Sequence, residues 1–243
     1  MLVRDARMPE TEIIFSVVET PDRTRRWNMT RKTNAWMMVV LLGAALPATA
    51  LAEPVTFKLL PKYSRATFKS DAPLETFVGN TADTGITATL TVDPARPQAA
   101  KGVVKVNMNE VSTGIDKRDA DMRSKDYLDT ENEANRWVAF EIKSVEIAGP
   151  LEPGKTLPAK VRGILTVKQK PIERVADATV SYIKLTPAEV EAQKRFGFTT
   201  DNIKVRAKFL TTFTDHGMKV PELLFFKVAN EIQLETDLTF TRQ

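Results

Sequence analysis

Apolar and polar residues alternate along most of the chain from residue 55 onward. Successive side chains of a β-strand point to opposite faces, so this period of two predicts antiparallel strands that bury one face. Many such strands in succession are typical of a β-barrel or a β-sandwich. The predicted apolar faces are formed by Ile86, Ala88, Leu90 and Val92; by Val104, Val106 and Met108; by Leu157, Ala159, Val161, Gly163, Leu165 and Val167; by Ala176, Ala178, Val180 and Tyr182; by Val205, Ala207, Phe209, Thr211 and Phe213; and by Ile232, Leu234, Leu238 and Phe240.

Two segments interrupt the strands. Thr186, Pro187 and Glu189 form a capping box, which predicts a short helix that Gly197 ends. Residues 116–129 are dense in charge, and we expect them to form a loop with a helical turn that crosses one end of the barrel. Turn residues separate the strands at Asp93-Pro94, Gly149-Pro150, Glu152-Pro153-Gly154 and Asp201-Asn202.

The predicted interior combines small and large side chains. A closed sheet of about eight strands can be filled by its own side chains or can hold one small ligand. The small inward residues favour a cavity, whereas the large aromatic ones are able to fill it, and apolar pockets and apolar cores use the same residue types. The periodicity therefore leaves both interiors open. The small residues are Ala88, Ala159, Gly163, Ala176, Ala178 and Ala207, and the large ones are Trp137, Phe140, Phe209 and Phe213.

Composition excludes several kinds of site. The chain has no cysteine, which excludes disulfides, thiolate nucleophiles and thiolate metal ligands. Its one histidine, His216, excludes metal sites built from several imidazoles. Half of the formal net charge of +4 belongs to residues 1–52, so the rest of the chain is nearly balanced. Such a surface is no electrostatic footprint for nucleic acid, and we expect no nucleic-acid partner.

Residues 29–52 have the pattern of a cleavable secretory signal. Residues 29–32 are positively charged, residues 35–46 are apolar, and Ala50 and Ala52 have the spacing that signal peptidase reads. The apolar run has about a dozen residues, fewer than the roughly 20 that cross a bilayer. We therefore expect export and cleavage after Ala52, and an uncleaved membrane anchor is the alternative.

The remaining chain divides simply. Residues 1–28 show no coherent pattern, and we interpret them as an extension that precedes the true start of translation at Met29. Residues 53–243 are expected to form one exported domain. The predicted fold class is all-β, with an antiparallel β-barrel of about eight strands and one or two short helices.

Residues 112–129 resemble the signature of the YceI-like family. That signature runs from a strand into an Arg-Asp pair, then Leu or Met, Arg and Ser, and then an aromatic Asp-Phe-Phe/Leu-Asp segment. Weaker similarities follow in the family's order, so the resemblance covers essentially all of residues 55–241. The chain departs from the family at Lys168-Gln169-Lys170, where other members have a glycine-containing turn. The matching residues are Arg118-Asp119, Met122-Arg123-Ser124 and Asp126-Tyr127-Leu128-Asp129.

The resemblance implies an extended, lipocalin-like barrel that binds polyisoprenoid chains, usually in the periplasm, with no established catalysis. The expected ligand is a long-chain polyisoprenoid such as a quinone or a polyprenyl phosphate, and no cofactor is expected. Burial of such a chain yields roughly 25 cal/mol per Å² of apolar surface, so apolar walls suffice. For each wall residue, ordinary core packing is the alternative. The predicted wall consists of Ile86, Leu90, Val104, Val106, Met108, Met122, Phe140, Ile142, Leu165, Val180, Phe209 and Phe213.

Arg118 and Arg123 are the candidates to bind a polar head group, because guanidinium groups match phosphate oxygens. The alternative is an ion-pair network with the neighbouring carboxylates Asp116, Asp119, Asp121 and Asp126. We interpret His216, between Asp215 and Gly217, as a turn residue, and we predict no catalytic and no metal-binding residue.

Three functions follow from these patterns. The first is a periplasmic protein that carries or sequesters a polyisoprenoid and makes transient contact with a membrane or a membrane redox protein. The second is a hydrolase or isomerase that acts on a lipid-like substrate in the same cavity and depends on His216. The third is an interaction protein with a filled barrel, such as a homodimer that packs residues 116–129 on its neighbour.

Overall fold

The computed structural model describes residues 53–223 and 226–243. The predicted extension over residues 1–28 and the predicted signal over residues 29–52, including the cleavage site at Ala52, lie outside the described residues. Within the described part of the chain, no helix has the length and apolar character needed to cross a membrane.

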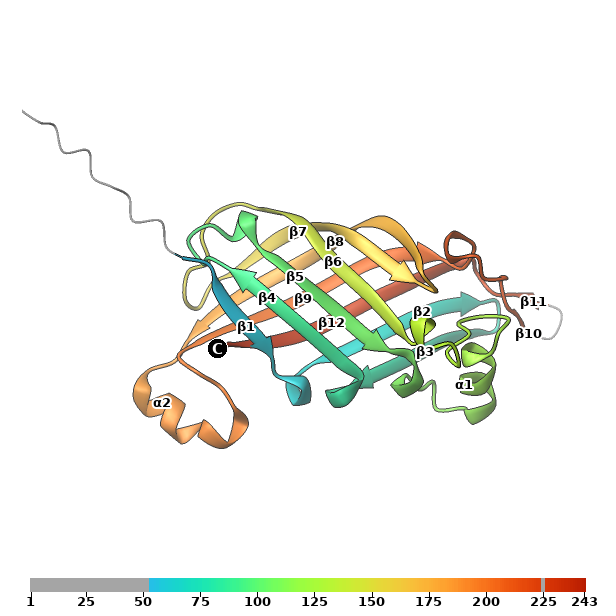
Figure 1. Ribbon diagram of the computed structural model, residues 1–243, viewed down its shortest axis with the longest axis horizontal. Helices are drawn as coiled ribbons and strands as arrows, with labels where there is room; N and C mark the ends of the chain where they lie inside the picture. Colours follow the sequence, from blue (N-terminus) through green and yellow to red (C-terminus); the bar gives the residue numbers. More distant parts are fainter. Residues whose placement is uncertain (1–52, 224–225) are drawn as a thin grey trace, which may run out of the picture. The chain divides into compact units, whose positions relative to one another are not determined.

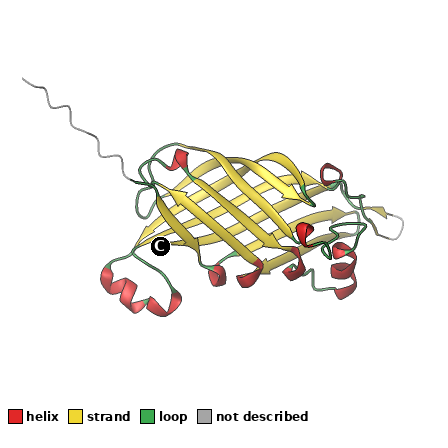
Figure 2. Cartoon of the chain, viewed as in Figure 1, coloured by secondary structure: helices red, strands yellow, loops and turns green. Residues whose placement is uncertain are grey.

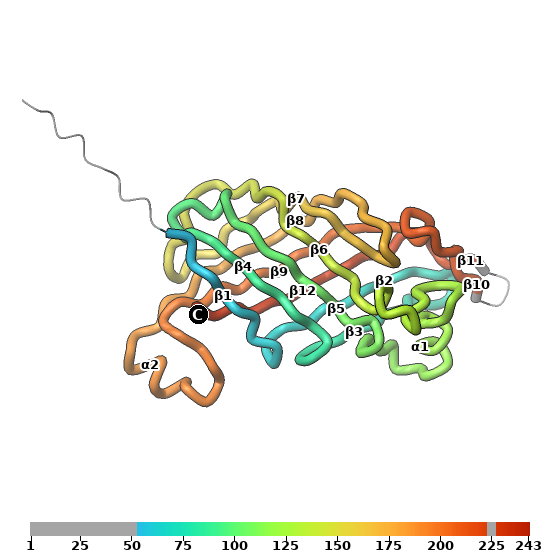
Figure 3. Tube along the Cα trace, in the orientation of Figure 1, coloured from blue at the N-terminus to red at the C-terminus, as the bar shows by residue number. Residues whose placement is uncertain are grey.

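The domain is built almost entirely from β-strands (Figure 1; Figure 2). Its helices, α1 and α2, lie at opposite ends of the barrel (Figure 3). The strands are β1 (Val55–Leu59), β2 (Arg65–Ala72), β3 (Glu75–Ala82), β4 (Ile86–Val92), β5 (Lys101–Asn107), β6 (Trp137–Ile147), β7 (Thr156–Val167), β8 (Lys170–Lys184), β9 (Asp201–Thr212), β10 (Glu222–Leu223), β11 (Phe226–Lys227) and β12 (Glu231–Arg242). The helices are α1 (Asp116–Arg123) and α2 (Pro187–Ala192).

Eight antiparallel strands close into a barrel. The sheet runs in the order β1-β4-β5-β6-β7-β8-β9-β12, and β1 pairs with β12 to close it. Only three residue pairs form this closure, with Phe57 opposite Arg242 and Leu59 opposite Phe240 at its two ends. The predicted fold class, a lipocalin-like all-β barrel of about eight strands with two short helices, is confirmed.

The hairpin of β2 and β3 extends the sheet at the other end of the barrel. Strand β2 pairs with β12 through residues 65–69, beyond the point where β1 leaves it. The outer edge of β3 has one bridge within the described chain, between Asn80 and Ser112, whose two backbone hydrogen bonds measure 2.9 and 3.0 Å. From Ser112 the chain continues into α1 at this end of the barrel (Figure 1). Helix α1 and its flanking loops, rather than another strand, therefore complete this side.

The predicted faces agree with the observed burial. On β4, Ile86, Leu90 and Val92 are buried, whereas Thr87 and Thr89 between them are exposed. The predicted turn at Asp201-Asn202 is wrong, because both residues begin β9. Both polar side chains are buried and form hydrogen bonds, and Asp201 accepts one from the Tyr182 hydroxyl.

The barrel interior is filled at one end only. Around the β1–β12 closure, large side chains pack into a continuous core, which we call the plug. Its buried members include Phe57, Leu59, Ile86, Leu90, Val92, Tyr182, Ile203, Leu238 and Phe240. A second and smaller cluster lies toward α1 and contains Met108, Val111, Leu128, Leu165, Val167 and Met218. The two predicted interiors therefore coexist in one barrel.

Inward glycines make room for aromatic rings instead of leaving empty space. A Cβ on Gly163 would lie 2.5 Å from Cζ of Phe140 on β6, and a Cβ on Gly79 would lie 2.2 Å from Cε1 of Phe68 on β2. Each ring thus covers the glycine of a neighbouring strand. The expectation that Gly163 opens the interior needs this correction, because its missing side chain is replaced by the Phe140 ring.

We predict that Gly163→Ala lowers the free energy of unfolding by about 1–3 kcal/mol, the usual cost of overpacking a core. The new methyl group would also lie 2.5 Å from the Glu141 carbonyl oxygen on the paired strand. Gly149→Ala is the control, because a Cβ there meets nothing within 4 Å. Urea unfolding of both variants measures the difference, and equal stability would show that the ring does not depend on the glycine.

Candidate functional site

A cavity of about 630 Å³ occupies the part of the barrel between the plug and α1. Strands β2, β3, β5 to β9 and β12 form its wall, and the α1 segment closes one side. Aliphatic and aromatic side chains dominate the wall. Apart from Glu235 on β12, the Asp, Glu, Lys and Arg residues that border it come from α1, the loop after α1 and β10, at the end away from the plug; they are Lys117, Arg118, Asp121, Asp126 and Glu222. This end is therefore the mouth of the cavity.

Nine of the twelve predicted wall residues line this cavity. They are Val104, Val106, Met108, Met122, Phe140, Ile142, Leu165, Phe209 and Phe213. Ile86, Leu90 and Val180 are not among the lining residues, because they belong to the plug or pack against it. They lie nearer the β1–β12 closure, where opposite walls meet, and the period of two carries no information about position along the barrel axis.

The hairpin of β2 and β3 supplies wall residues that were not predicted. Phe68 and Phe77 line the cavity from this hairpin, and Leu234 lines it from β12. The rings of Phe140 on β6 and Phe209 on β9 contact each other inside the barrel, with centroids 5.2 Å apart and an angle of 42° between the ring planes. The alternation on β12 identified Leu234 as inward, so the sequence held a signal for that residue.

Arg118 lies at the mouth of the cavity and ties α1 to β3. Its Nη2 donates to Glu75 at 2.7 Å, and its guanidinium carbon lies 4.5 Å from the centroid of the Phe77 ring. Cation–π contacts of this kind add to the ion pair. The partner of Arg118 is thus Glu75, and not one of the four nearby aspartates weighed as alternatives. Only one of the five N–H donors of the guanidinium is used by Glu75.

Arg123 has a structural position away from the cavity. Its Nη2 donates to the Val111 carbonyl at 2.6 Å and its Nε to the Met108 carbonyl at 3.3 Å. It does not line the cavity, which corrects the expectation that it lies beside Arg118 at a head-group site. The two arginines are five residues apart on a helix, so their side chains leave it in different directions.

Asp119 holds the start of α1. Its carboxylate accepts hydrogen bonds from the Ser112 hydroxyl at 2.7 Å, and from the Thr113 hydroxyl and backbone N–H at 2.6 and 2.8 Å. Burial alone would raise the pKa of Asp119, but these hydrogen bonds outweigh it and hold the pKa below its usual value. The contacts fix α1 to the segment that bridges β3.

Residues 57–240 match the family model of the YceI-like domain. The chain belongs to the YceI-like family. The predicted family membership is confirmed, and the signature residues of this YceI-like barrel now have positions. Arg118 is at the mouth, Asp119 and Arg123 hold backbone groups, and Met122, Tyr127 and Leu128 line the cavity.

Solved structures share this fold at low sequence identity. A polyisoprenoid-binding domain from Saccharophagus degradans implicated in plant cell wall breakdown has a TM-score of 0.54 and 15% identity, covering 78% of this chain and 99% of its own. BcnA of Burkholderia cenocepacia has a TM-score of 0.52 and 15% identity, covering 72% and 95%. The YceI protein of Campylobacter jejuni has a TM-score of 0.51 and 17% identity, covering 68% and 84%. These likenesses concern the fold, and a comparison with curated proteins finds no match.

The turn that departs from the family connects β7 and β8. Lys168 and Gln169 adopt φ values of 49° and 60° without glycine. Their side chains reach the loop that follows α1, because Lys168 Nζ donates to the Lys125 carbonyl and Gln169 Nε2 donates to Asn135 Oδ1. These two hydrogen bonds tie the β7–β8 turn to the chain that follows α1.

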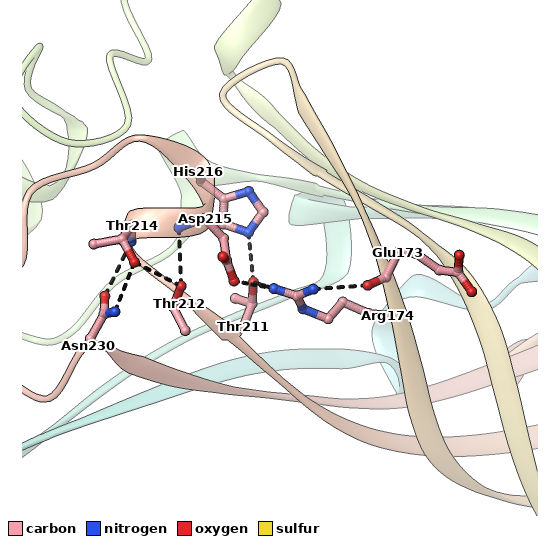
Figure 4. Close-up of polar contacts among 8 residues, drawn as sticks. All are labelled: Glu173, Arg174, Thr211, Thr212, Thr214, Asp215, His216 and Asn230. Atoms are coloured by element: carbon pink, nitrogen blue, oxygen red, sulfur yellow. Dashed lines mark hydrogen bonds and ion pairs between the residues drawn. The ribbon is translucent and has the colours of Figure 1, made fainter. Parts of the chain in front are cut away.

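A polar cluster borders the cavity near this turn (Figure 4). His216, in the 3-10 turn Thr214–His216 that follows β9, is fully buried, and its Nε2 lies 2.7 Å from the Thr211 hydroxyl. Arg174 donates to the same hydroxyl at 3.4 Å and pairs with Asp215. The Thr211 hydroxyl therefore links the Arg174 guanidinium to the His216 imidazole.

His216 is a neutral buried base. Burial lowers the pKa of its imidazole, and the positive charge of Arg174 adds to the effect, whereas the Lys170 backbone and the Asp215 carboxylate oppose it. Nδ1 has no hydrogen bond of good geometry within the described residues. The interpretation of His216 as a turn residue is confirmed in position, but its burial beside the cavity was not predicted.

We predict that acid weakens the fold through His216. Its folded-state pKa is lower than the ordinary value of 6.5, so the unfolded chain binds the proton more readily. The resulting stability is present above pH 6.5 and is lost as the pH falls through the lowered folded-state value. Because this is the only histidine, His216→Gln should flatten the dependence of the unfolding free energy on pH in this window. Urea titrations at a series of pH values measure it, and an unchanged slope would contradict the assignment.

Proposed function

We propose that this protein binds the prenyl chain of a polyisoprenoid lipid in the barrel and carries or sequesters it in the periplasm. The observation that carries the proposal is the apolar cavity of about 630 Å³, open at a charged mouth and closed by the plug. Its size lies in the range of small-molecule sites, and its wall offers many apolar contacts with few polar anchors. Membership of the YceI-like family, and a fold neighbour described as a polyisoprenoid-binding domain, support the same class of ligand.

The mouth supports a head group that lies outside the apolar wall. Arg118 borders the cavity there with donors to spare, and its partner Glu75 is partly exposed. A polyprenyl phosphate would place its anionic oxygens beside this guanidinium. A quinone would need no such cation. Arg118 therefore distinguishes the two ligand classes by charge.

The polar cluster around His216 offers little support for catalysis. A histidine that activates a hydroxyl group requires a third group that orients its other ring nitrogen. The neighbouring carboxylate of Asp215 is instead paired with Arg174, and no carboxylate hydrogen-bonds Nδ1 within the described residues. We therefore propose binding without chemical conversion of the lipid.

The predicted secretory signal supports the periplasmic part of the proposal. The pattern of residues 29–52 predicts a secretory signal, and a carrier of an insoluble chain is useful in an aqueous compartment between membranes. Expression of the full chain in a Gram-negative host, followed by fractionation and N-terminal sequencing, tests this part. Retention of the mature protein in the cytoplasm would contradict it.

The lipid itself is tested by extraction. Protein purified without detergent should release a prenyl lipid into organic solvent in near-stoichiometric amount, detected by mass spectrometry. A second protein purified from the same host in the same way is the control for adventitious lipid. Repeated extractions at the level of the control would favour an interaction protein instead.

We predict that Phe209→Asp reduces both lipid retention and stability. Phe209 lines the cavity and packs on Phe140, and burial of an unpaired carboxylate costs several kcal/mol. Leu210→Asp is the matched control on the same strand, because Leu210 is 45% exposed. Thermal unfolding and lipid content are measured on both variants. If the two substitutions have equal effects, the inward face of β9 is assigned wrongly.

We predict that Arg118→Ala weakens binding of a polyprenyl phosphate by about tenfold or more, the usual effect of losing a charged hydrogen bond, and leaves binding of a prenyl quinone unchanged. Arg195→Ala removes the same charge near α2, at the other end of the barrel (Figure 1), and should change neither affinity. Fluorescence competition with both ligands measures the effects. Equal losses for the two ligands would show that Arg118 acts only through its ion pair with Glu75.

A further inference from the structure

The cavity ends at one level along the barrel axis. On β12 the wall includes Thr236 and Leu238, whereas the next inward residue, Phe240, belongs to the plug alone. On β9 it includes Ala207 and Val205, whereas Ile203 belongs to the plug alone. Leu238 and Val205 are directly paired across the two strands. This pair, which we call the floor, belongs to both the cavity and the core.

The floor closes the barrel to a long chain. Behind it lie Tyr182, Ile203 and Phe240, all less than a tenth exposed and packed in one cluster. Close-packed interiors do not admit further groups without displacement of side chains. A prenyl chain that enters at the mouth therefore stops at the floor, and any part beyond that length stays outside the wall.

The cavity volume sets the length that fits. A group of the size of water takes about 30 Å³, and a methylene group is of similar size, so a cavity of about 630 Å³ holds on the order of 20 carbon atoms, or about four prenyl units. Each methylene group that leaves water raises the affinity about fourfold, whereas carbons that stay in water add little.

Building on the proposed function, we propose that the Leu238–Val205 floor measures the prenyl chain. Affinity rises with each unit up to about four units, because each one buries new apolar surface, and then becomes constant. The protein thus selects against short prenyl chains and accepts long ones whatever their total length. Leu238 and Val205 are the residues that determine this specificity.

A series of prenyl alcohols with identical head groups tests the proposal. The probes are geraniol, farnesol, geranylgeraniol and solanesol, which have two, three, four and nine prenyl units, in competition with radiolabelled farnesol on the mature domain. We expect affinity to rise steeply up to geranylgeraniol and to differ less than about fourfold between geranylgeraniol and solanesol, the effect of one methylene group. A continued steep rise to solanesol would overturn the floor.

Two variants move the floor in opposite directions. Ala207→Leu fills the level directly above the Leu238–Val205 pair and should move the plateau to farnesol. Leu238→Ala lowers the floor and should increase the gain from geranylgeraniol to solanesol. Leu234→Ala is the matched control, because it removes the same side chain from β12 nearer the mouth and should weaken all chains without moving the plateau.

Each result has one consequence. If the plateau stays at the same chain length in Ala207→Leu, the floor is overturned while the proposed function stands. Ala207→Leu keeps the site apolar, so it decides the question even if Leu238→Ala fails to fold. If none of the four alcohols binds to the unchanged protein, the proposed function fails together with the floor.

Discussion

The architecture depends on how one edge of strand β12 is shared between two partner strands. Strand β12 pairs with β9 along its whole length, but its other edge is divided between β1 at one end and β2 at the other. Where β1 closes the barrel, opposite walls come together and large side chains fill the interior. Where β2 and β3 extend the sheet, the outer edge of β3 pairs with no further strand of the described chain, and α1 with its loops covers this side. A filled end and a hollow end follow from this one arrangement of backbone hydrogen bonds.

The packed core at the filled end offsets the stability that the cavity at the other end costs. An empty apolar cavity forfeits the dispersion contacts of its lining, which lowers stability. The plug, with aromatic residues such as Phe57 and Phe240 almost fully buried, compensates within the same domain. The proposed prenyl chain would restore these contacts, so its binding would raise the stability of the fold. At the hollow end, Arg118 ties α1 to Glu75 on β3, and Gln169 ties the β7–β8 turn to Asn135 in the segment that follows α1.

Local patterns predicted much of this molecule. The period of two identified the strands and their inward faces, and the capping box at Thr186 is present, with both reciprocal hydrogen bonds. The predicted helical segment is α1. These features depend on neighbours within a few residues, which periodicity and capping describe directly. The signature of residues 112–129 added the family, which no local pattern contained.

Long-range contacts account for what the sequence did not predict. Arg118 pairs with a residue 43 positions away, and four carboxylates nearer in sequence masked that partner. Leu90 and Phe209 look alike in the pattern, but only the closure of the barrel decides that one belongs to the plug and the other to the cavity. The ring of Phe140 over Gly163 reverses the simplest interpretation of an inward glycine. His216 is buried because its turn folds back onto β9, where its imidazole forms a hydrogen bond with the Thr211 hydroxyl.

The central claim is that the barrel is hollow between the Leu238–Val205 floor and Arg118. The crystal structure of protein purified without removal of lipid tests it most directly. The account predicts continuous elongated electron density that begins at the floor, passes along the side chains of Phe68, Phe140 and Phe209, and leaves at Arg118. Side chains that fill this space and leave no room for a prenyl chain would contradict it.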